Sequence, residues 1–211
     1  MSSPLPPSPP PHLLRRSFWT DERSVLLGWC LWSALAIVIT ITVLRGVGSV
    51  TQEYRHAAQA FVRGEPMYSP GAMGWLYPVQ SAMVFLPFAF EPALVFEVAW
   101  RLVGIFGLAF AVRSLTLNCG FLQAGPEAPR HNLFFVVTIF ALPTAAGAAS
   151  NGQINLHLTA ILALACVCVM KRSWWWATFW LALAVAAKPV AIVLLLLYLA
   201  LHRPLWWRVP I

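Results

Sequence analysis

Two polar stretches inside this apolar chain have residue types that could bind a sugar phosphate. Asn151-Gly152-Gln153-Ile154-Asn155 lies between apolar segments, and its three side-chain amides offer paired donors and acceptors that suit sugar hydroxyls. The same residues also suit a tight turn, because Asn and Gly tolerate turn conformations. Lys188 stands at the midpoint of another apolar segment, where lysine costs about 2.5–3.5 kcal/mol on insertion scales. Its charge should pair either with a buried carboxylate such as Glu97 or with an anionic phosphate carried by a lipid.

The neighbours of these stretches have structural interpretations. Pro189 should kink the helix after Lys188, because proline frees a backbone carbonyl and opens room for a polar partner. Glu97 and Arg101 are four residues apart in an apolar segment, so we expect them to neutralise one another in a structural role. His157 follows the amide stretch by one turn and is expected to be a satisfied interior histidine.

Composition predicts a membrane protein. Of 211 residues, 60% are apolar and only 10% are charged, whereas a soluble domain carries about 25% charged residues. The net charge of +7 comes from 14 scattered Lys and Arg residues with no basic patch, so we expect no nucleic-acid partner. The four cysteines have no metal-ligand spacing to a histidine. We therefore predict no metal site and no cofactor.

The apolar segments predict an all-α, polytopic helical membrane protein. A helix needs about 20 apolar residues to cross a bilayer. Residues 24–211 form the predicted transmembrane domain, preceded by a proline-rich arm at 1–23 that should be disordered and cytoplasmic. The short segment at 78–90 carries Pro87, and is either a thin span or the first arm of a bent helix. The other apolar segments are 24–44, 93–115, 133–149, 154–170 and 175–201.

Loop charges favour the arrangement in which 78–90 does not cross by itself. The cytoplasmic side then holds Arg15, Arg16, Arg23, Arg113, Arg130, Lys171 and Arg172, and the outer side holds Arg45, Arg55, Arg63, Arg203 and Arg208. The positive-inside rule therefore predicts five full spans in the cell membrane, with the N-terminus in the cytoplasm. It also predicts loop 45–77 and the turn at 150–153 on the outer face. Tryptophans at 174–176 and 206–207 should flank the last span at the two headgroup layers.

The outer loop at 45–77 is predicted to contain an amphipathic helix at 51–63. Apolar residues recur there at helical spacing on one face, and Gly64 and Pro66 would end the helix. A helix of this kind next to a span lies in the membrane interface. Glu53 falls at the edge of the apolar face, where the simplest interpretation is a solvated carboxylate.

The motifs in order resemble glycosyltransferase family 87, the polyprenol-phosphate-mannose-dependent α-1,2-mannosyltransferases of the GT-C superfamily. The resemblance covers about 45–205 and rests on Gly64-Glu65-Pro66-Met67-Tyr68, Leu76-Tyr77-Pro78, Gly152-Gln153-Ile154-Asn155 and Lys188-Pro189. It implies inverting-type transfer of a hexose, mannose in the family, from a polyprenol-phosphate donor at the outer face to a glycan or glycolipid acceptor. The outer loop would form the floor of the active site. The substrate-binding residues would be Tyr77, Asn151, Gln153, Asn155 and Lys188.

Family members usually carry an acidic residue, commonly Asp, in the first outer loop as the general base. The only aspartate of this chain, Asp21, precedes the first span, so Glu53 is the first candidate for the base and Glu65 the second. Tyr77-Pro78-Val79 also replaces the more usual Tyr-Pro-Pro. Family members are about twice this length, so the chain looks like a GT-C-like N-terminal module. The competing prediction is a non-catalytic or degenerate multi-pass membrane protein.

Overall fold

The computed structural model of the chain describes residues 22–46, 50–68, 77–90, 92–123 and 133–208, so that the predicted arm lies almost wholly outside them. Every regular element in these ranges is helical, which confirms the all-α prediction. The elements are α1 (Glu22–Leu44), α2 (Thr51–Arg63), η3 (Val79–Phe88), α3 (Ala93–Gln123), α4 (Phe134–Ser150), α5 (Asn155–Met170), α6 (Trp174–Ala187), η4 (Pro189–Ala191), α7 (Ile192–Leu201) and η5 (Arg203–Leu205), where η marks a 3₁₀ helix.

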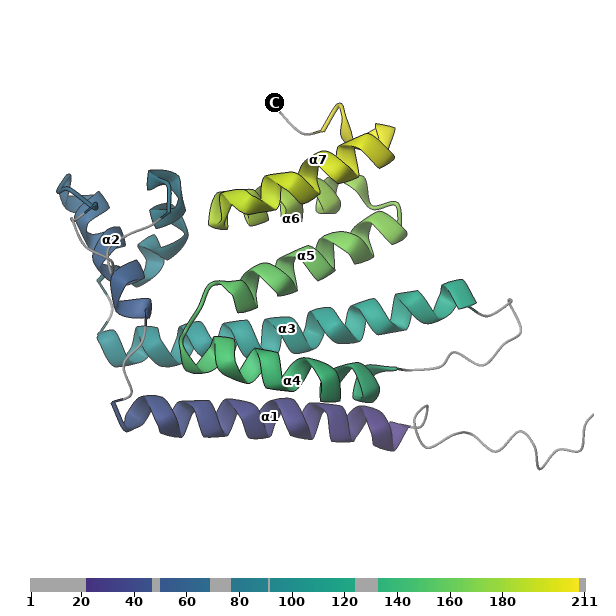
Figure 1. The fold of residues 1–211 in the computed structure, drawn as a ribbon, viewed down its shortest axis with the longest axis horizontal. Coiled ribbons are helices and arrows are strands. Elements are labelled where there is room, and N and C mark those ends of the chain that lie inside the picture. The colour runs from purple at the N-terminus through teal and green to yellow at the C-terminus, as the bar shows by residue number, and fades with distance from the viewer. Residues whose placement is uncertain (1–21, 47–49, 69–76, 91, 124–132, 209–211) are drawn as a thin grey trace, which may run out of the picture.

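The long helices form a bundle whose two ends differ (Figure 1). Contacts join α1 to α3 and α4, α3 to α5, and α5 to α6. The α2 end of the bundle contains α2, η3, the turn between α4 and α5, and the break between α6 and α7. The other end, which we call the tryptophan end, contains residues 22–23, 170–176 and 201–208.

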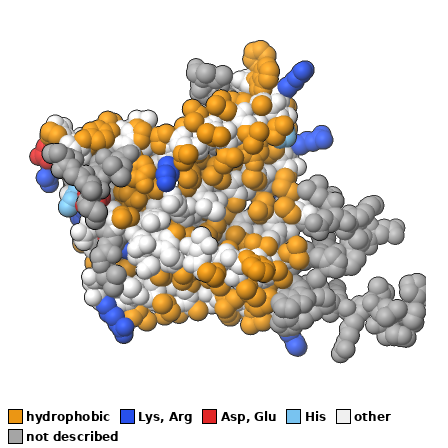
Figure 2. Space-filling view, in the orientation of Figure 1, with side chains coloured by type: hydrophobic (Ala, Val, Ile, Leu, Met, Phe, Trp, Pro, Cys, Tyr) orange, Lys and Arg blue, Asp and Glu red, His pale blue; other side chains and the backbone are white. Residues whose placement is uncertain are grey.

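Within the described ranges, two helices are long and apolar enough to cross a membrane: α1 and the part of α3 from Leu94 to Cys119. Their core contacts are well formed: Trp32 of α1 is fully buried, and its indole N–H donates to Thr138 Oγ1 of α4 at 3.1 Å. Large apolar side chains also cover the outside of the bundle, as Figure 2 shows in orange. Phe140, for example, is 78% exposed, and Ile37 is 60% exposed. Apolar surface of this extent suits contact with lipid.

The prediction of one continuous span over 175–201 is wrong, because the chain reverses at its middle. Helix α6 ends at Ala187, and α7 runs back beside it (Figure 1). The rings of Trp174, where α6 begins, and His202, just after α7, are 5.7 Å apart. At 1.5 Å per residue, α6 spans about 21 Å and α7 about 15 Å, so neither covers a hydrocarbon core of about 30 Å. Residues 174–201 form a helical hairpin.

The properties of proline explain why helix α6 ends before Pro189, but not the direction that α7 then takes. Lys188 is extended, with φ −151° and ψ 111°, the region that a residue before proline prefers. Pro189 has no N–H, so it cannot continue the α6 hydrogen-bond ladder. The Ser81 hydroxyl of η3 donates to the Ala186 carbonyl, in the last turn of α6, at 3.0 Å. The hairpin corrects the predicted depth of Lys188, which lies at the α2 end and not at the middle of a span.

The segment predicted at 78–90 is a 3₁₀ helix that packs across the α2 end. Ten residues at about 2.0 Å each give about 20 Å, which is too short to cross a bilayer. Phe85 is fully buried between α2 and α3, with its ring 4.7 Å from Tyr54 and 4.9 Å from Trp100. This packing agrees with the arrangement in which the segment does not cross by itself.

A buried ion pair ties the elements of the α2 end together. The Arg101 guanidinium, 2% exposed, pairs with the Glu97 carboxylate as predicted, and both lie on α3. Arg101 also donates to the carbonyls of Ala149, at 2.9 Å, and Ser150, at 3.3 Å, at the end of α4. The Thr51 hydroxyl, at the start of α2, donates to the other oxygen of Glu97. Three helices therefore meet at one pair of charges.

The hairpin predicts that both tryptophan groups lie on one side of the membrane. The Arg208 guanidinium is 5.4 Å from the Trp175 ring, so the groups at 174–176 and 206–207 share an end. In a background without native cysteines, Trp175→Cys and Trp207→Cys should react with an impermeant maleimide from the same side of sealed vesicles. A continuous span would expose them on opposite sides, and that labelling pattern would refute the hairpin.

The buried ion pair predicts a large loss of stability for Arg101→Met. Removal of the guanidinium leaves the Glu97 charge buried and unpaired, which costs about 3–5 kcal/mol in the free energy of unfolding. Denaturant unfolding in detergent micelles measures this loss, with the exposed Arg45→Met as the matched control. Glu97→Gln combined with Arg101→Met should recover part of the loss, because no charge is then left without a partner. Equal stability of Arg101→Met and Arg45→Met would contradict the role of the pair.

Candidate active site

The structure brings together four of the predicted substrate-binding residues at the α2 end. Lys188 Nζ donates to Asn155 Oδ1 at 2.8 Å and lies 5.9 Å from the centre of the Tyr77 ring. The Asn155 amide N–H points in turn to Gln153 Oε1, at a longer distance of 3.4 Å. We call these residues the Lys188 cluster: Tyr77, Gln153, Asn155 and Lys188. It contains residues from three parts of the chain that are far apart in sequence.

The charge of Lys188 has no carboxylate partner in the part of the chain that the structure describes. The one ion pair found there is Arg101–Glu97, in which Glu97 already accepts from Arg101 and Thr51. Pairing of Lys188 with Glu97, one of the two predicted alternatives, is therefore wrong. A half-exposed ammonium held by a neutral amide keeps its charge available for an anionic ligand.

Tyr54 connects α2 to the cluster through Tyr77. The two hydroxyls are 3.5 Å apart, and the rings meet edge to face with centres 5.9 Å apart. Burial raises the pKa of Tyr54, with the Tyr77 hydroxyl adding to the effect and the Ile154 backbone opposing it. Tyr54 is therefore a neutral phenol at physiological pH, able to donate or accept a hydrogen bond but not to act as a base.

The amide stretch is a tight turn whose backbone is held from two sides. Gly152 has φ +65°, and the N–H groups of Gly152 and Gln153 donate to the last carbonyls of α4. The Asn151 carbonyl accepts from the Val50 N–H at 3.3 Å, just before α2 begins. The predicted turn is confirmed. Asn151 is exposed, and its backbone carbonyl links the turn to the start of α2.

Glu53 and Glu65 lie on or beside α2 but in different settings. Glu53 is half-buried in the first turn, next to Tyr54, whereas Glu65 is exposed beyond the end of the helix. Gly64, with φ +67°, and Glu65 close α2 by donating their N–H groups to the carbonyls of Phe61 and Ala60. Neither carboxylate takes part in a hydrogen bond or ion pair with any residue that the structure describes. The Glu53 backbone N–H likewise donates to the Val50 carbonyl, at 3.2 Å, so the two residues differ in the burial of their side chains and not in the use of their backbones.

Sequence reasoning missed Trp100 of α3, which holds the turn that carries Gln153 and Asn155. Its indole N–H donates to the Gly152 carbonyl at 3.0 Å, and its ring stacks on His157 at 3.7 Å between centres. His157 Nε2 lies 3.0 Å from the Trp100 carbonyl, as expected of an interior histidine. The histidine ring fits because Gly104 is opposite: a Cβ there would approach it to 2.8 Å. The sequence signal that could have found Trp100 is its position directly before Arg101 inside an apolar segment.

Comparison with known proteins identifies the family. The model of glycosyltransferase family 87 matches residues 75–209, more than half of the chain. The match includes the whole Lys188 cluster but neither Glu53 nor Glu65. No curated protein and no solved structure matches the chain. The family and the two long apolar helices together indicate a membrane protein. The chain belongs to glycosyltransferase family 87.

Proposed function

We propose that the chain transfers a hexose from a polyprenol-phosphate donor to a glycan or glycolipid acceptor at the outer face of the cell membrane. The observation that carries this proposal is the contact of Lys188 with Asn155 and Tyr77, beside a turn with further amides. The ammonium would hold the donor phosphate, and the amides would hold sugar hydroxyls. The resemblance of the motifs to family 87 favours mannose as the sugar.

Orientation follows from the cations at the two ends of the bundle. Figure 2 shows most blue side chains at the ends and few on the apolar sides. The hairpin moves Arg203 and Arg208 to the tryptophan end, where the cations are now Arg23, Arg113, Lys171, Arg172, Arg203 and Arg208. The α2 end holds Arg45, Arg55, Arg63 and Lys188, besides Arg101, which Glu97 neutralises. The positive-inside rule then favours a cytoplasmic tryptophan end and N-terminus, with the Lys188 cluster at the outer face.

The helical hairpin gives Lys188 a position that suits a lipid-borne phosphate. A lysine at the tip of a hairpin that enters from the tryptophan end lies about 21 Å into a hydrocarbon core of about 30 Å. Its long side chain can extend toward the outer headgroup layer, where phosphates of lipids are found. Family enzymes that use a polyprenol phosphate must bring a charged headgroup and an apolar tail to the same site. The exposed apolar side chains of α7, such as Val193 and Leu197, begin one turn beyond Lys188 and offer a surface for the tail.

Glu53 is the proposed general base. The acceptor hydroxyl attacks the anomeric carbon, so that a new glycosidic C–O bond forms and the bond to the phosphate oxygen breaks. The hydroxyl proton passes to the Glu53 carboxylate. The polyprenol phosphate leaves with the bonding electron pair, and Lys188 offsets the negative charge that develops on it. Glu53 is preferred to Glu65 because it adjoins Tyr54, which contacts the cluster through Tyr77.

One observation favours the second candidate function, a non-catalytic membrane protein of the same family. Lys188, Asn155 and Gln153 make no hydrogen bond or ion pair with a carboxylate in the part of the chain that the structure describes. A donor-binding protein without a base would retain the phosphate and sugar contacts and lack transfer. Assays of binding and transfer on the same preparation separate the two functions.

Lys188→Met tests the phosphate contact. The variant should insert into the membrane and unfold at the same temperature as the wild type, because Lys188 has no buried partner to lose. Its affinity for a short-chain polyprenol phosphate should fall about ten- to a hundredfold, since hydrogen bonds to charged groups contribute about 1.5–3 kcal/mol. Lys171→Met removes an exposed lysine at the other end and is the matched control. Misfolding of Lys188→Met with normal binding by the surviving protein would assign Lys188 to the fold.

Glu53→Gln tests the base in membranes from cells that express the native reading frame. Transfer from a polyprenol-phosphate sugar should fall about 10²–10⁴-fold, the usual contribution of a general base, while donor binding persists. Glu65→Gln is the matched control and should stay within a few-fold of wild type. The reverse pattern would move the role to Glu65. Activity of both variants would place the base elsewhere, and an inactive wild type that binds donor would favour the non-catalytic function.

A further inference from the structure

An open pocket lies at the tryptophan end of the bundle, at the opposite end from the Lys188 cluster. It has a volume of about 480 Å³ and lies between the end of α5, the start of α6 and the end of α7. Cavities of about 300–1,000 Å³ are typical of small-molecule sites. Its polar lining is cationic or aromatic: Arg172, Trp174, His202 and Arg203. We call it the Arg172 pocket.

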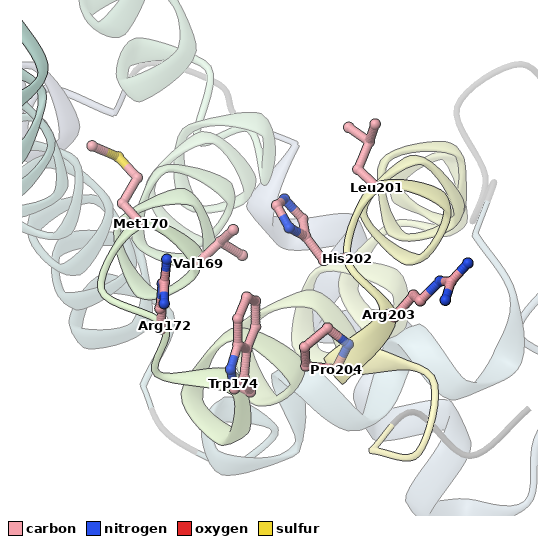
Figure 3. A pocket seen from close by; sticks show the side chains of 8 residues that line it. All are labelled: Val169, Met170, Arg172, Trp174, Leu201, His202, Arg203 and Pro204. Carbon is pink, nitrogen blue, oxygen red and sulfur yellow. The ribbon is translucent and has the colours of Figure 1, made fainter.

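The two arginines of the pocket, Arg172 and Arg203, have no anionic partner among the residues that the structure describes. Figure 3 shows Arg172 and His202 on two sides of the pocket, while the Arg203 side chain points away from both. Neither guanidinium has a hydrogen-bond or ion-pair partner within the described ranges. The His202 ring is held in place by Trp174, with centres 5.7 Å apart, and by Tyr198 at 6.1 Å. The pocket thus offers the unpaired guanidinium of Arg172 beside ordered rings, with the charge of Arg203 at its outer edge.

The backbone of Arg172 adopts the left-handed conformation, which is unfavourable for a residue with a Cβ. Arg172 has φ +56°, the only positive φ of a non-glycine residue among the residues described. It closes α5 in a Schellman motif, in which the N–H of Ser173 donates to Cys168 and that of Arg172 donates to Val169. Glycine normally occupies this site, because a Cβ crowds the following carbonyl.

Two other helices of the chain end in the same motif and can be compared with α5. The same closure at the end of α2 uses Gly64, with φ +67°, and the one at the end of α4 uses Gly152, with φ +65°. Among the helix ends that the structure describes, that of α5 alone has a bulky cation at this position, beside a pocket. Strained conformations of this kind persist where the side chain has a function. Arg172 therefore points to a ligand for its guanidinium.

The surroundings indicate which anion that ligand carries. Trp175, Trp176, Trp206 and Trp207 are exposed at this end, with Trp207 at 91%, and exposed tryptophan is enriched at the headgroup layer of membranes. Leu201 and Met170 also line the pocket, so an apolar chain has apolar side chains to contact beside the cations. A guanidinium binds phosphate oxygens in a bidentate manner. These features fit one ligand with a phosphate head and an acyl tail.

We propose that the Arg172 pocket binds the phosphate headgroup of an anionic phospholipid. Arg172 holds the phosphate, Arg203 adds charge at the rim, and the exposed tryptophans keep the pocket at headgroup depth. The proposal rests on the membrane placement of the chain and not on sugar transfer. It concerns the end of the bundle away from the Lys188 cluster, so either site can be abolished without the other.

Binding of fluorescent phosphatidylglycerol to the whole chain in detergent tests the proposal. Arg172→Gly should weaken binding about tenfold and raise the melting temperature, because glycine relieves the left-handed strain. Arg172→Asn, which also tolerates positive φ, should weaken binding to a similar extent. Lys171→Gln removes the neighbouring charge, which does not line the pocket, and should bind within about twofold of wild type.

Competitors distinguish the sources of the phosphate. Unlabelled phosphatidylglycerol should displace the probe, whereas phosphatidylcholine with the same acyl chains and soluble glycerol 3-phosphate should displace it poorly. Equal losses in Arg172→Gly and Lys171→Gln would show unspecific attraction of anionic lipid and overturn the site. Equal competition by phosphatidylcholine would overturn the preference for an anionic headgroup. Displacement by glycerol 3-phosphate alone at similar concentration would assign the pocket to a soluble phosphate and overturn the lipid.

Discussion

The α2 end of this protein depends on satisfying one buried guanidinium. Arg101 is nearly inaccessible to solvent, so its five donors must find acceptors inside the protein. The carbonyls at the end of α4 lack helical donors and carry the negative end of the helix dipole. A cation therefore stabilises them. Contacts with Ala149 and Ser150 meet both needs and fix where the turn to α5 begins.

The same charge also positions α2. Glu97 neutralises Arg101 and accepts from Thr51, the first residue of α2, and the following turn of α2 carries Glu53 and Tyr54. The proposed base and the amide turn are therefore held by opposite sides of one ion pair. Trp100, adjacent to Arg101 on α3, adds a hydrogen bond to the Gly152 carbonyl. A change in this pair would displace the candidate catalytic and binding residues together.

Local spacing was sufficient to predict many elements of this structure. Helix α2 and its glycine end, the Glu97–Arg101 pair, and the turn at Gly152 all depend on residues within a few positions of one another. The family motifs supplied the residues of the Lys188 cluster. The sequence could not predict the direction of the chain after Pro189, because proline ends a helix without choosing the next direction. Long-range contacts choose it, such as the Trp174–His202 pair.

The reversal after Lys188 changes the environment of this lysine and the partner that its charge requires. At the middle of a continuous span, a lysine would need a buried carboxylate, and Glu97 was the natural candidate. At the tip of a hairpin, Lys188 needs only a neutral partner such as Asn155, and its charge stays available. The reversal also returns the chain to the tryptophan end, where His202 and Arg203 join Arg172 around one cavity. A single proline break thus brings one cation to the proposed donor site and completes a separate cationic pocket at the opposite end.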